Sequence, residues 1–146
     1  MVEKTAARAV RRGDTVHLVP HKLSRDVGYE LPSINKAFFT RKYRYYYATG
    51  MYDPNVFRNS VLKVNTETGE VLTWRENEFS FPGEAQFVAR PGATDEDDGV
   101  LLCAVADVRR DHSDFLLVLD ARSMTELARA QVTVHVPAAL HGIFLH

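Results

Sequence analysis

The chain has 146 residues, of which 45% are hydrophobic and 25% are charged, and its formal net charge is −1. This length and composition are those of one globular domain with a hydrophobic core. The near-neutral charge argues against a nucleic-acid partner, because binding to a phosphate backbone calls for a basic surface.

The single cysteine, Cys103, lies within the apolar run 100–105. One cysteine excludes an internal disulfide, and these neighbours predict a buried, unreactive thiol. The first residues lack the apolar stretch of a signal peptide, and no run is long enough to span a bilayer. We therefore expect a reducing, cytoplasmic location.

The first forty residues carry one strand candidate. Residues 1–14, with three arginines and two adjacent alanines, predict either an exposed leading segment or a short helix, and residues 15–19 predict a strand that ends at Pro20. His17 and His21 stand four residues apart, a spacing that brings side chains together on a helix. The extended context instead predicts two surface histidines rather than a joint metal site.

A basic, aromatic stretch follows at residues 41–47, where arginine and lysine alternate with tyrosines. Such a stretch can stack on single-stranded nucleic acid. It also fits a half-buried strand whose side chains alternate between two faces. Because the chain has no wider basic surface, we favour the strand.

Six strands are predicted from residue 60 onward, at residues 60–65, 70–74, 86–90, 99–107, 114–120 and 126–134. Residues 66–69 read as a hairpin turn in which Gly69 adopts a positive φ. The acidic segment 91–99 has the composition of a calcium loop but not the ligand spacing, so we predict a solvated loop. The polar turn 109–113 predicts that His112 points to water.

A weak internal repeat relates residues 61–71 to residues 116–127, since each reads strand, polar turn, glutamate, strand. A repeat of this kind, built from short antiparallel strands, is typical of β-propeller blades. The chain holds about two blades' worth of strands, and blades bury their faces against neighbours. We therefore expect an all-β chain of antiparallel four-stranded sheets that forms part of a larger propeller.

Three polar residues stand alone among apolar neighbours: Glu30 in residues 30–35, Glu84 in residues 81–88 and His141 in residues 140–144. A charged group in such surroundings requires a partner. These settings, with the acidic segment 91–100 and residues 119–130, resemble the carotenoid cleavage oxygenases. The resemblance is to their animal branch, the β-carotene oxygenases and the retinal-pigment-epithelium isomerohydrolase. It is collinear from about residue 28 and corresponds to the C-terminal portion of a family member.

The resemblance implies a seven-bladed β-propeller that holds one Fe(II) through four histidines, with glutamates hydrogen-bonding behind them. His141 matches the last of those ligands, Glu30 and Glu84 match two of the glutamates, and Leu31 matches a position that lines the substrate tunnel. Neutral imidazole suits Fe(II), and a carboxylate on the far ring nitrogen fixes the tautomer. The implied partners are a carotenoid or retinoid, O2 and, for the full-length enzyme, a peripheral membrane contact.

Two departures from the family pattern affect this expectation. Ala85 follows Glu84 where the family usually has proline, and the other three ligand histidines have no counterpart in the chain. One imidazole cannot hold Fe(II) firmly, so we expect the chain alone to be inactive as an oxygenase.

The leading hypothesis is therefore the C-terminal part of an iron-dependent carotenoid oxygenase. Residues 74–76, 95–99 and 125–130 favour the type that cleaves β-carotene centrally, at the 15,15' bond. Eccentric cleavage at the 9',10' bond and retinoid isomerohydrolase activity stay open as alternatives. The hypothesis from a different class is a non-catalytic β-rich binding module, in which Glu30, Glu84 and His141 are only structural.

Overall fold

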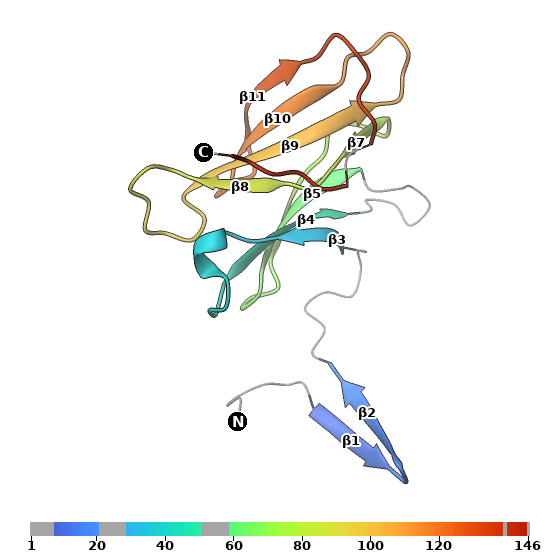
Figure 1. Cartoon of the computed structure of the whole chain (residues 1–146), viewed down its shortest axis with the longest axis vertical. Helices are drawn as coiled ribbons and strands as arrows, with labels where there is room; N and C mark the ends of the chain where they lie inside the picture. The colour runs from blue at the N-terminus through green and yellow to red at the C-terminus, as the bar shows by residue number, and fades with distance from the viewer. Residues whose placement is uncertain (1–7, 21–28, 51–58, 139, 146) are drawn as a thin grey trace.

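The computed structural model describes residues 8–20, 29–50, 59–138 and 140–145, and all of its strand pairs are antiparallel (Figure 1). Among the described residues, the regular secondary structure consists of strands and one short 3-10 helix, η1 (Lys36–Phe38). The strands are β1 (Arg8–Arg12), β2 (Thr15–Val19), β3 (Tyr29–Ser33), β4 (Tyr45–Gly50), β5 (Ser60–Asn65), β6 (Val71–Trp74), β7 (Ser80–Pro82), β8 (Gln86–Ala89), β9 (Gly99–Asp107), β10 (Phe115–Asp120) and β11 (Glu126–Gln131).

Strands β1 and β2 form a two-stranded ribbon joined by a turn in which Gly13 has a φ of +60°. The strand predicted at residues 15–19 is confirmed, and a helix over residues 8–12 is wrong, because these residues pair along the whole of β2. His17 is exposed, as predicted, whereas His21 and residues 1–7 lie outside the described residues.

The other strands form two sheets, one with the order β3-β4-β5-β6 and one with the order β11-β10-β9-β7, in which β8 also pairs with β9. Each sheet contains a run of three consecutive antiparallel strands, β4-β5-β6 and β9-β10-β11. The internal repeat of the sequence corresponds to the second hairpin of each run. The all-β prediction is thus confirmed, and one sheet has a fifth strand that was not expected.

The two sheets bury one hydrophobic core between them. Tyr47 and Val61, from the first sheet, belong to the same buried cluster as Leu101, Leu117 and Leu119 of the second. The Tyr47 ring stacks on Phe87 with the ring centroids 5.8 Å apart. The prediction of a strand at the basic, aromatic stretch is confirmed for its C-terminal half, because β4 covers residues 45–50 and buries Tyr47.

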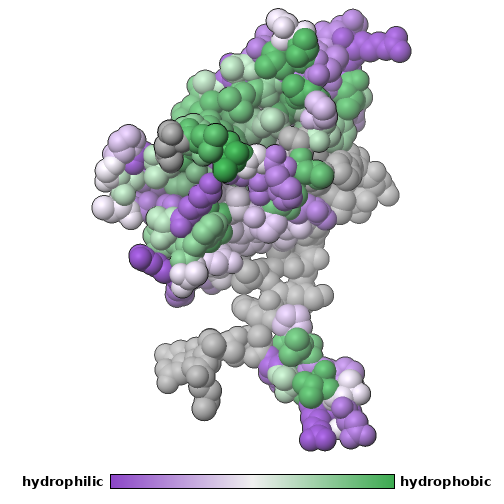
Figure 2. Space-filling view, in the orientation of Figure 1, coloured by the Kyte–Doolittle hydropathy of each residue, from purple (hydrophilic) through white to green (hydrophobic). Residues whose placement is uncertain are grey.

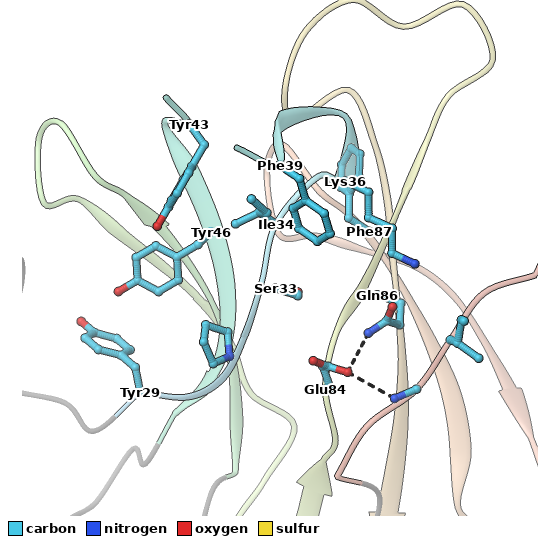
Figure 3. Close-up of a pocket in the computed structure, with 13 residues that line it drawn as sticks. Tyr29, Ser33, Ile34, Lys36, Phe39, Tyr43, Tyr46, Glu84, Gln86 and Phe87 are labelled. Atoms are coloured by element: carbon cyan, nitrogen blue, oxygen red, sulfur yellow. Dashed lines mark hydrogen bonds between the residues drawn. The ribbon is translucent and has the colours of Figure 1, made fainter. Parts of the chain in front are cut away.

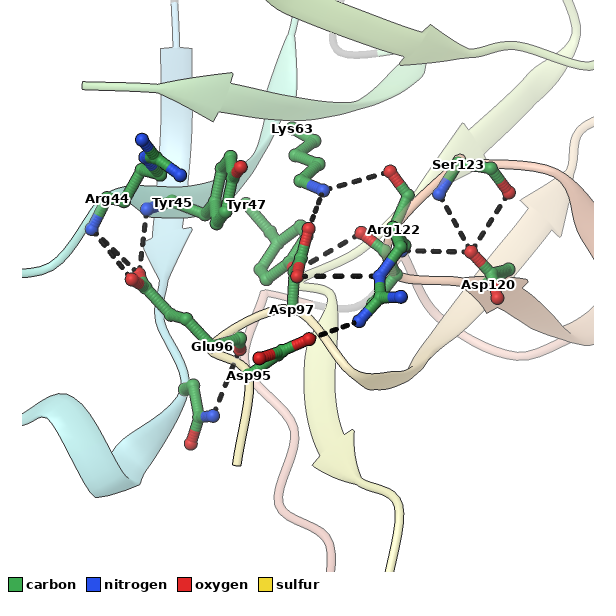
Figure 4. Close-up of polar contacts among 12 residues, drawn as sticks. Arg44, Tyr45, Tyr47, Lys63, Asp95, Glu96, Asp97, Asp120, Arg122 and Ser123 are labelled. Carbon is green, nitrogen blue, oxygen red and sulfur yellow. Dashed lines mark hydrogen bonds and ion pairs between the residues drawn. The ribbon is translucent and has the colours of Figure 1, made fainter. Parts of the chain in front are cut away.

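The acidic segment 91–99 forms a loop whose residues 91, 92, 94 and 95 are exposed, as the sequence predicts, but its second half is not solvated. The carboxylate of Asp97 is buried and pairs with the Lys63 ammonium at 2.6 Å, as Figure 4 shows. Glu96 accepts hydrogen bonds from the backbone N–H groups of Arg44 and Tyr45 at 2.7 to 2.9 Å. The segment follows β8 and contacts β4 and β5, so it joins the two sheets. In the described ranges no cluster of His, Cys, Asp or Glu could hold a metal ion here or elsewhere.

Cys103 is buried in β9, as the sequence predicts. Burial raises the pKa of its thiol to about 12, and Sγ donates a hydrogen bond to the Gly83 backbone carbonyl at 3.1 Å. Hydrophobic surface gathers over the sheet of β9, β10 and β11 and over the described part of the chain that follows β11, and also on the β1–β2 ribbon (Figure 2). Within the described residues, no helix has the length and hydropathy needed to cross a membrane.

Candidate functional site

The link between β7 and β8 holds Glu84 in a fixed backbone position. On one side, the Gly83 N–H donates to the Ala104 carbonyl at 2.9 Å. On the other side, Ala85 is fully buried and its carbonyl accepts a hydrogen bond from the Ser33 hydroxyl of β3 at 2.5 Å. The first bond ties the link to β9 and the second ties it to the other sheet. The Glu84 side chain is therefore presented from a rigid part of the fold.

Three groups converge on one oxygen of Glu84, Oε2, and Figure 3 shows the two that donate hydrogen bonds to it. The Gln86 amide donates to it at 2.8 Å, and the Gly142 backbone N–H donates at 3.2 Å. The Nδ1 atom of His141 lies 3.5 Å from the same oxygen, a polar contact longer than an ordinary hydrogen bond. The fold thus brings together two of the three polar residues that the sequence singles out.

A carboxylate beside Nδ1 favours the tautomer in which Nδ1 carries the proton. The other ring nitrogen, Nε2, then has a free lone pair that can accept a hydrogen bond or bind a metal. Because the His141 side chain is 75% exposed, the ring is accessible to such a ligand. The pair therefore presents an imidazole whose Nε2 atom is open to a ligand.

Glu30 and Leu31 lie in β3, at an irregularity in its pairing with β4. Leu31 has a φ of +49°, unusual for a bulky residue, and the register shifts between Glu30 and Ser33. Bulges of this kind redirect side chains and recur near functional sites. Glu30 is exposed, its carbonyl accepts a hydrogen bond from the Thr49 hydroxyl at 3.3 Å, and no contact among the described residues joins its side chain to Glu84 or His141.

A cavity of about 700 Å³ opens between β3 and Glu84 (Figure 3), and His141 lines a separate cavity of about 290 Å³ on the other side of Glu84 and Gly142. Glu84 and Gln86 form part of the wall of the larger cavity, and Leu31 lies between two of its lining residues, Tyr29 and Pro32, without lining it. The remaining wall is largely aromatic or aliphatic and includes Ile34, Phe39, Tyr43, Tyr46 and Phe87. A concave, mostly apolar site with a few polar groups is suited to an apolar small molecule.

Gln86 was not predicted from the sequence, although it makes the shortest hydrogen bond to Glu84. Alternate residues of an extended chain project to the same side. The spacing of two between Glu84 and Gln86 was therefore a usable signal.

Two antiparallel sheets around one core, with an exposed histidine next to a carboxylate that lines an aromatic cavity, define an all-β protein with a candidate imidazole metal ligand. The family profile described as RPE65, retinal pigment epithelial membrane protein, matches residues 3–146. The chain belongs to this family, the carotenoid cleavage oxygenases.

Two relatives illustrate the similarity in sequence. Human β,β-carotene 15,15'-dioxygenase is 42% identical over 146 residues, which cover 99% of this chain and 26% of that protein. The mitochondrial carotenoid-cleaving dioxygenase of Mustela putorius furo is 38% identical over 130 residues, covering 88% of this chain and 24% of that protein. The chain therefore spans about a quarter of the length of these relatives.

Solved structures extend the similarity to the fold. Cobalt-substituted Synechocystis ACO superposes with a TM-score of 0.74 and 32% identity, covering 79% of this chain and 25% of that one. A mutant of Synechocystis apocarotenoid oxygenase superposes with a TM-score of 0.77 and 30% identity, covering 88% of this chain and 26% of that one. The chain thus has the fold of part of an apocarotenoid oxygenase.

Proposed function

We propose that this chain is the C-terminal part of a non-haem Fe(II) carotenoid oxygenase. The full-length protein would use O2 to cleave a carotenoid double bond, giving apocarotenals or retinal. The observation that carries the proposal is the contact of His141 with Glu84, 3.5 Å apart, where Glu84 forms part of the wall of an aromatic cavity. The 42% identity to human β,β-carotene 15,15'-dioxygenase supports central cleavage.

The residues of this chain can supply one imidazole ligand to an iron ion. His141 would bind the iron through Nε2, while the Glu84 carboxylate keeps the proton on Nδ1 and makes the ring a stronger donor. When bound, the iron supplies activation of dioxygen. The aromatic cavity would hold the polyene and exclude water from it. Glu30 remains a proposed further carboxylate of the site, and Leu31 a proposed neighbour of the substrate.

The two sheets support an assignment as two neighbouring blades of a seven-bladed propeller. Each sheet has a run of three consecutive antiparallel strands, and the two sheets pack across one core. Three further histidines would come from other blades, which this chain does not contribute. One imidazole binds Fe(II) weakly, so we propose that the chain alone does not turn over substrate. The single buried cysteine supports a reducing, cytoplasmic location.

A chimera tests the proposal directly. This chain would replace the matching C-terminal quarter of human β,β-carotene 15,15'-dioxygenase, and iron content and carotenoid products would then be measured. We expect about one iron per protein and retinal as the product, since four imidazoles complete the site. Longer apocarotenals would instead assign eccentric cleavage.

Two substitutions in the chimera identify the ligand. His141→Ala should remove both iron and turnover, whereas His112→Ala, at an exposed position in a turn, should leave both unchanged. Full iron content and turnover in the His141→Ala chimera would refute the ligand assignment. A chimera that folds but holds no iron even with His141 in place would favour the alternative of a non-catalytic β-rich module.

A further inference from the structure

The segment that carries His141 is held by side chains rather than by strand pairing. After β11 the chain turns and runs back across the sheet to end beside β8 (Figure 1). We call residues 132–145 the C-terminal segment, and its described residues belong to no strand. Since no ladder of backbone hydrogen bonds sets its path, individual contacts must place His141.

One buried acidic residue supplies several of those contacts, through its carboxylate and its backbone carbonyl. Asp114 precedes β10, and its side chain is only 1% exposed. Its Oδ2 accepts a hydrogen bond from the Val136 backbone N–H at 2.5 Å, and its Oδ1 accepts one from the Asp107 N–H at 2.8 Å. The ring of His135 lies 3.3 Å from Oδ1, and the Val132 N–H donates to the Asp114 carbonyl at 2.8 Å.

Apolar packing around this point is incomplete. Val136 and Ala138 line a cavity of about 640 Å³ together with Phe81 and Val108. Hydrogen bonds to a buried, charged acceptor are stronger than those between neutral groups. A buried N–H group that loses its hydrogen-bond acceptor also destabilises the folded state, because its desolvation is no longer compensated. The polar contacts of Asp114 therefore fix this part of the segment more tightly than its side-chain packing.

We infer that Asp114 is a positioning residue: it fixes the C-terminal segment at Val136 and thereby brings His141 to Glu84. Val136 stands five residues before His141, whereas β11 ends ten residues before it. A tether of half the length raises the local concentration of His141 at Glu84 about threefold, by the scaling of loop closure with length. The importance of this placement for iron rests on the proposed function, but the placement itself does not.

The inference can be tested on the full chain, labelled with 15N, by amide hydrogen exchange. In Asp114→Ala, we expect exchange at Gly142 to become at least about threefold faster, the factor given by loop closure. The amide of Leu101 in β9 should keep its rate. Asp114→Asn, which keeps one acceptor oxygen, should give a smaller increase in the exchange rate at Gly142. This variant replaces Asp114→Ala in the experiment if the alanine variant does not fold. Asp111→Asn, an exposed change in the same turn, is the matched control and should change neither rate.

The imidazole 15N chemical shifts of His141, compared at one fixed pH, provide a readout that a general loss of stability does not move. They should shift toward those of a free imidazole in the two Asp114 variants and stay unchanged in the control. Faster exchange at Val136 with no change at Gly142 or His141 would overturn the inference. An equal rise at Gly142 and Leu101 would do so too, because Asp114 would then act on global stability alone. Failure of the chimera to bind iron would leave this result intact.

Discussion

Lys63 of β5 and Asp97 of the acidic segment form an ion pair of 2.6 Å between the two sheets, with side chains only 5% and 12% exposed. The same ammonium donates to the Arg122 carbonyl at 2.9 Å and lies 4.2 Å from the centroid of the Tyr45 ring. Burial of a charge is costly unless a partner of opposite sign comes with it. The folding of the acidic segment onto the first sheet thus follows from the lysine in β5.

Removal of one partner of this pair should destabilise the chain strongly. We expect Asp97→Ala to lower the free energy of unfolding by about 3 kcal/mol, because Lys63 is left as a buried, uncompensated charge. Replacing both residues, with Lys63→Met added, should restore much of the loss. Urea denaturation of the two single variants and the double variant measures the coupling.

The exposed pair of Arg122 with Asp95, at 3.0 Å, offers a matched control. Asp95→Ala should change the free energy of unfolding by less than about 1 kcal/mol, as is usual for surface ion pairs. Equal losses for Asp95→Ala and Asp97→Ala would mean that burial of the Lys63–Asp97 pair adds nothing.

Cys103 should be unreactive until the chain unfolds. Its pKa of about 12 leaves about one thiolate in ten thousand at pH 8, and only the thiolate reacts. Labelling with a thiol-specific disulfide reagent should be slow in buffer and fast in urea. Rapid labelling of the folded chain would contradict the burial of this residue.

The strands were predictable from the sequence where they are long and apolar. The pattern at residues 60–65 coincides with β5, and that at residues 99–107 coincides with β9. Short strands were missed for local reasons. β7 has three residues and ends at Pro82, and β3 contains Pro32 beside the positive φ of Leu31. Proline and a left-handed residue are turn signals, so only the pairing with neighbouring strands reveals these segments.

The candidate site was predictable as a set of residue types but not as a set of contacts. The apolar neighbours of Glu84 and of His141 indicated that each required a polar partner. In the folded chain, each of the two residues is the partner of the other. The burial of Asp97 depends on a lysine 34 residues away in the sequence, and the anchoring of Val136 depends on Asp114. Pairings over such distances follow from the packing of the two sheets, which no local pattern encodes.

Acid should weaken the fold through Asp107. The Arg109 guanidinium, with Nη2 at 2.6 Å and Nε at 2.9 Å, lowers the pKa of the Asp107 carboxyl from 3.8 to about 2. A pKa that is lower in the folded chain contributes stability above the unfolded value, near pH 4, and the contribution is lost as the pH falls toward 2. The shift corresponds to about 2 kcal/mol.

Urea midpoints measured between pH 5 and pH 2 test this contribution. Asp107→Asn should lower the midpoint at pH 5 and flatten its decline toward pH 2, because the substituted side chain has no proton to bind. Asp111→Asn, at an exposed position in the following turn, should keep the slope of the original chain. An unchanged slope in Asp107→Asn would show that other carboxylates cause the acid sensitivity.

The hydrogen bond from Gln86 to Glu84, at 2.8 Å, should matter for metal binding although Gln86 contacts no ligand nitrogen. Gln86→Leu removes the donor that orients Glu84, so the carboxylate is less firmly held beside His141. In the chimera we expect Glu84→Gln to lower iron affinity about 10- to 100-fold, the range for loss of a partner behind a ligand. Gln86→Leu should give a smaller loss in the same direction.

Gln131→Leu, at the exposed end of β11, is the matched control and should leave iron affinity unchanged. If Glu84→Gln kept full affinity while His141→Ala lost it, His141 would bind iron without help from the carboxylate.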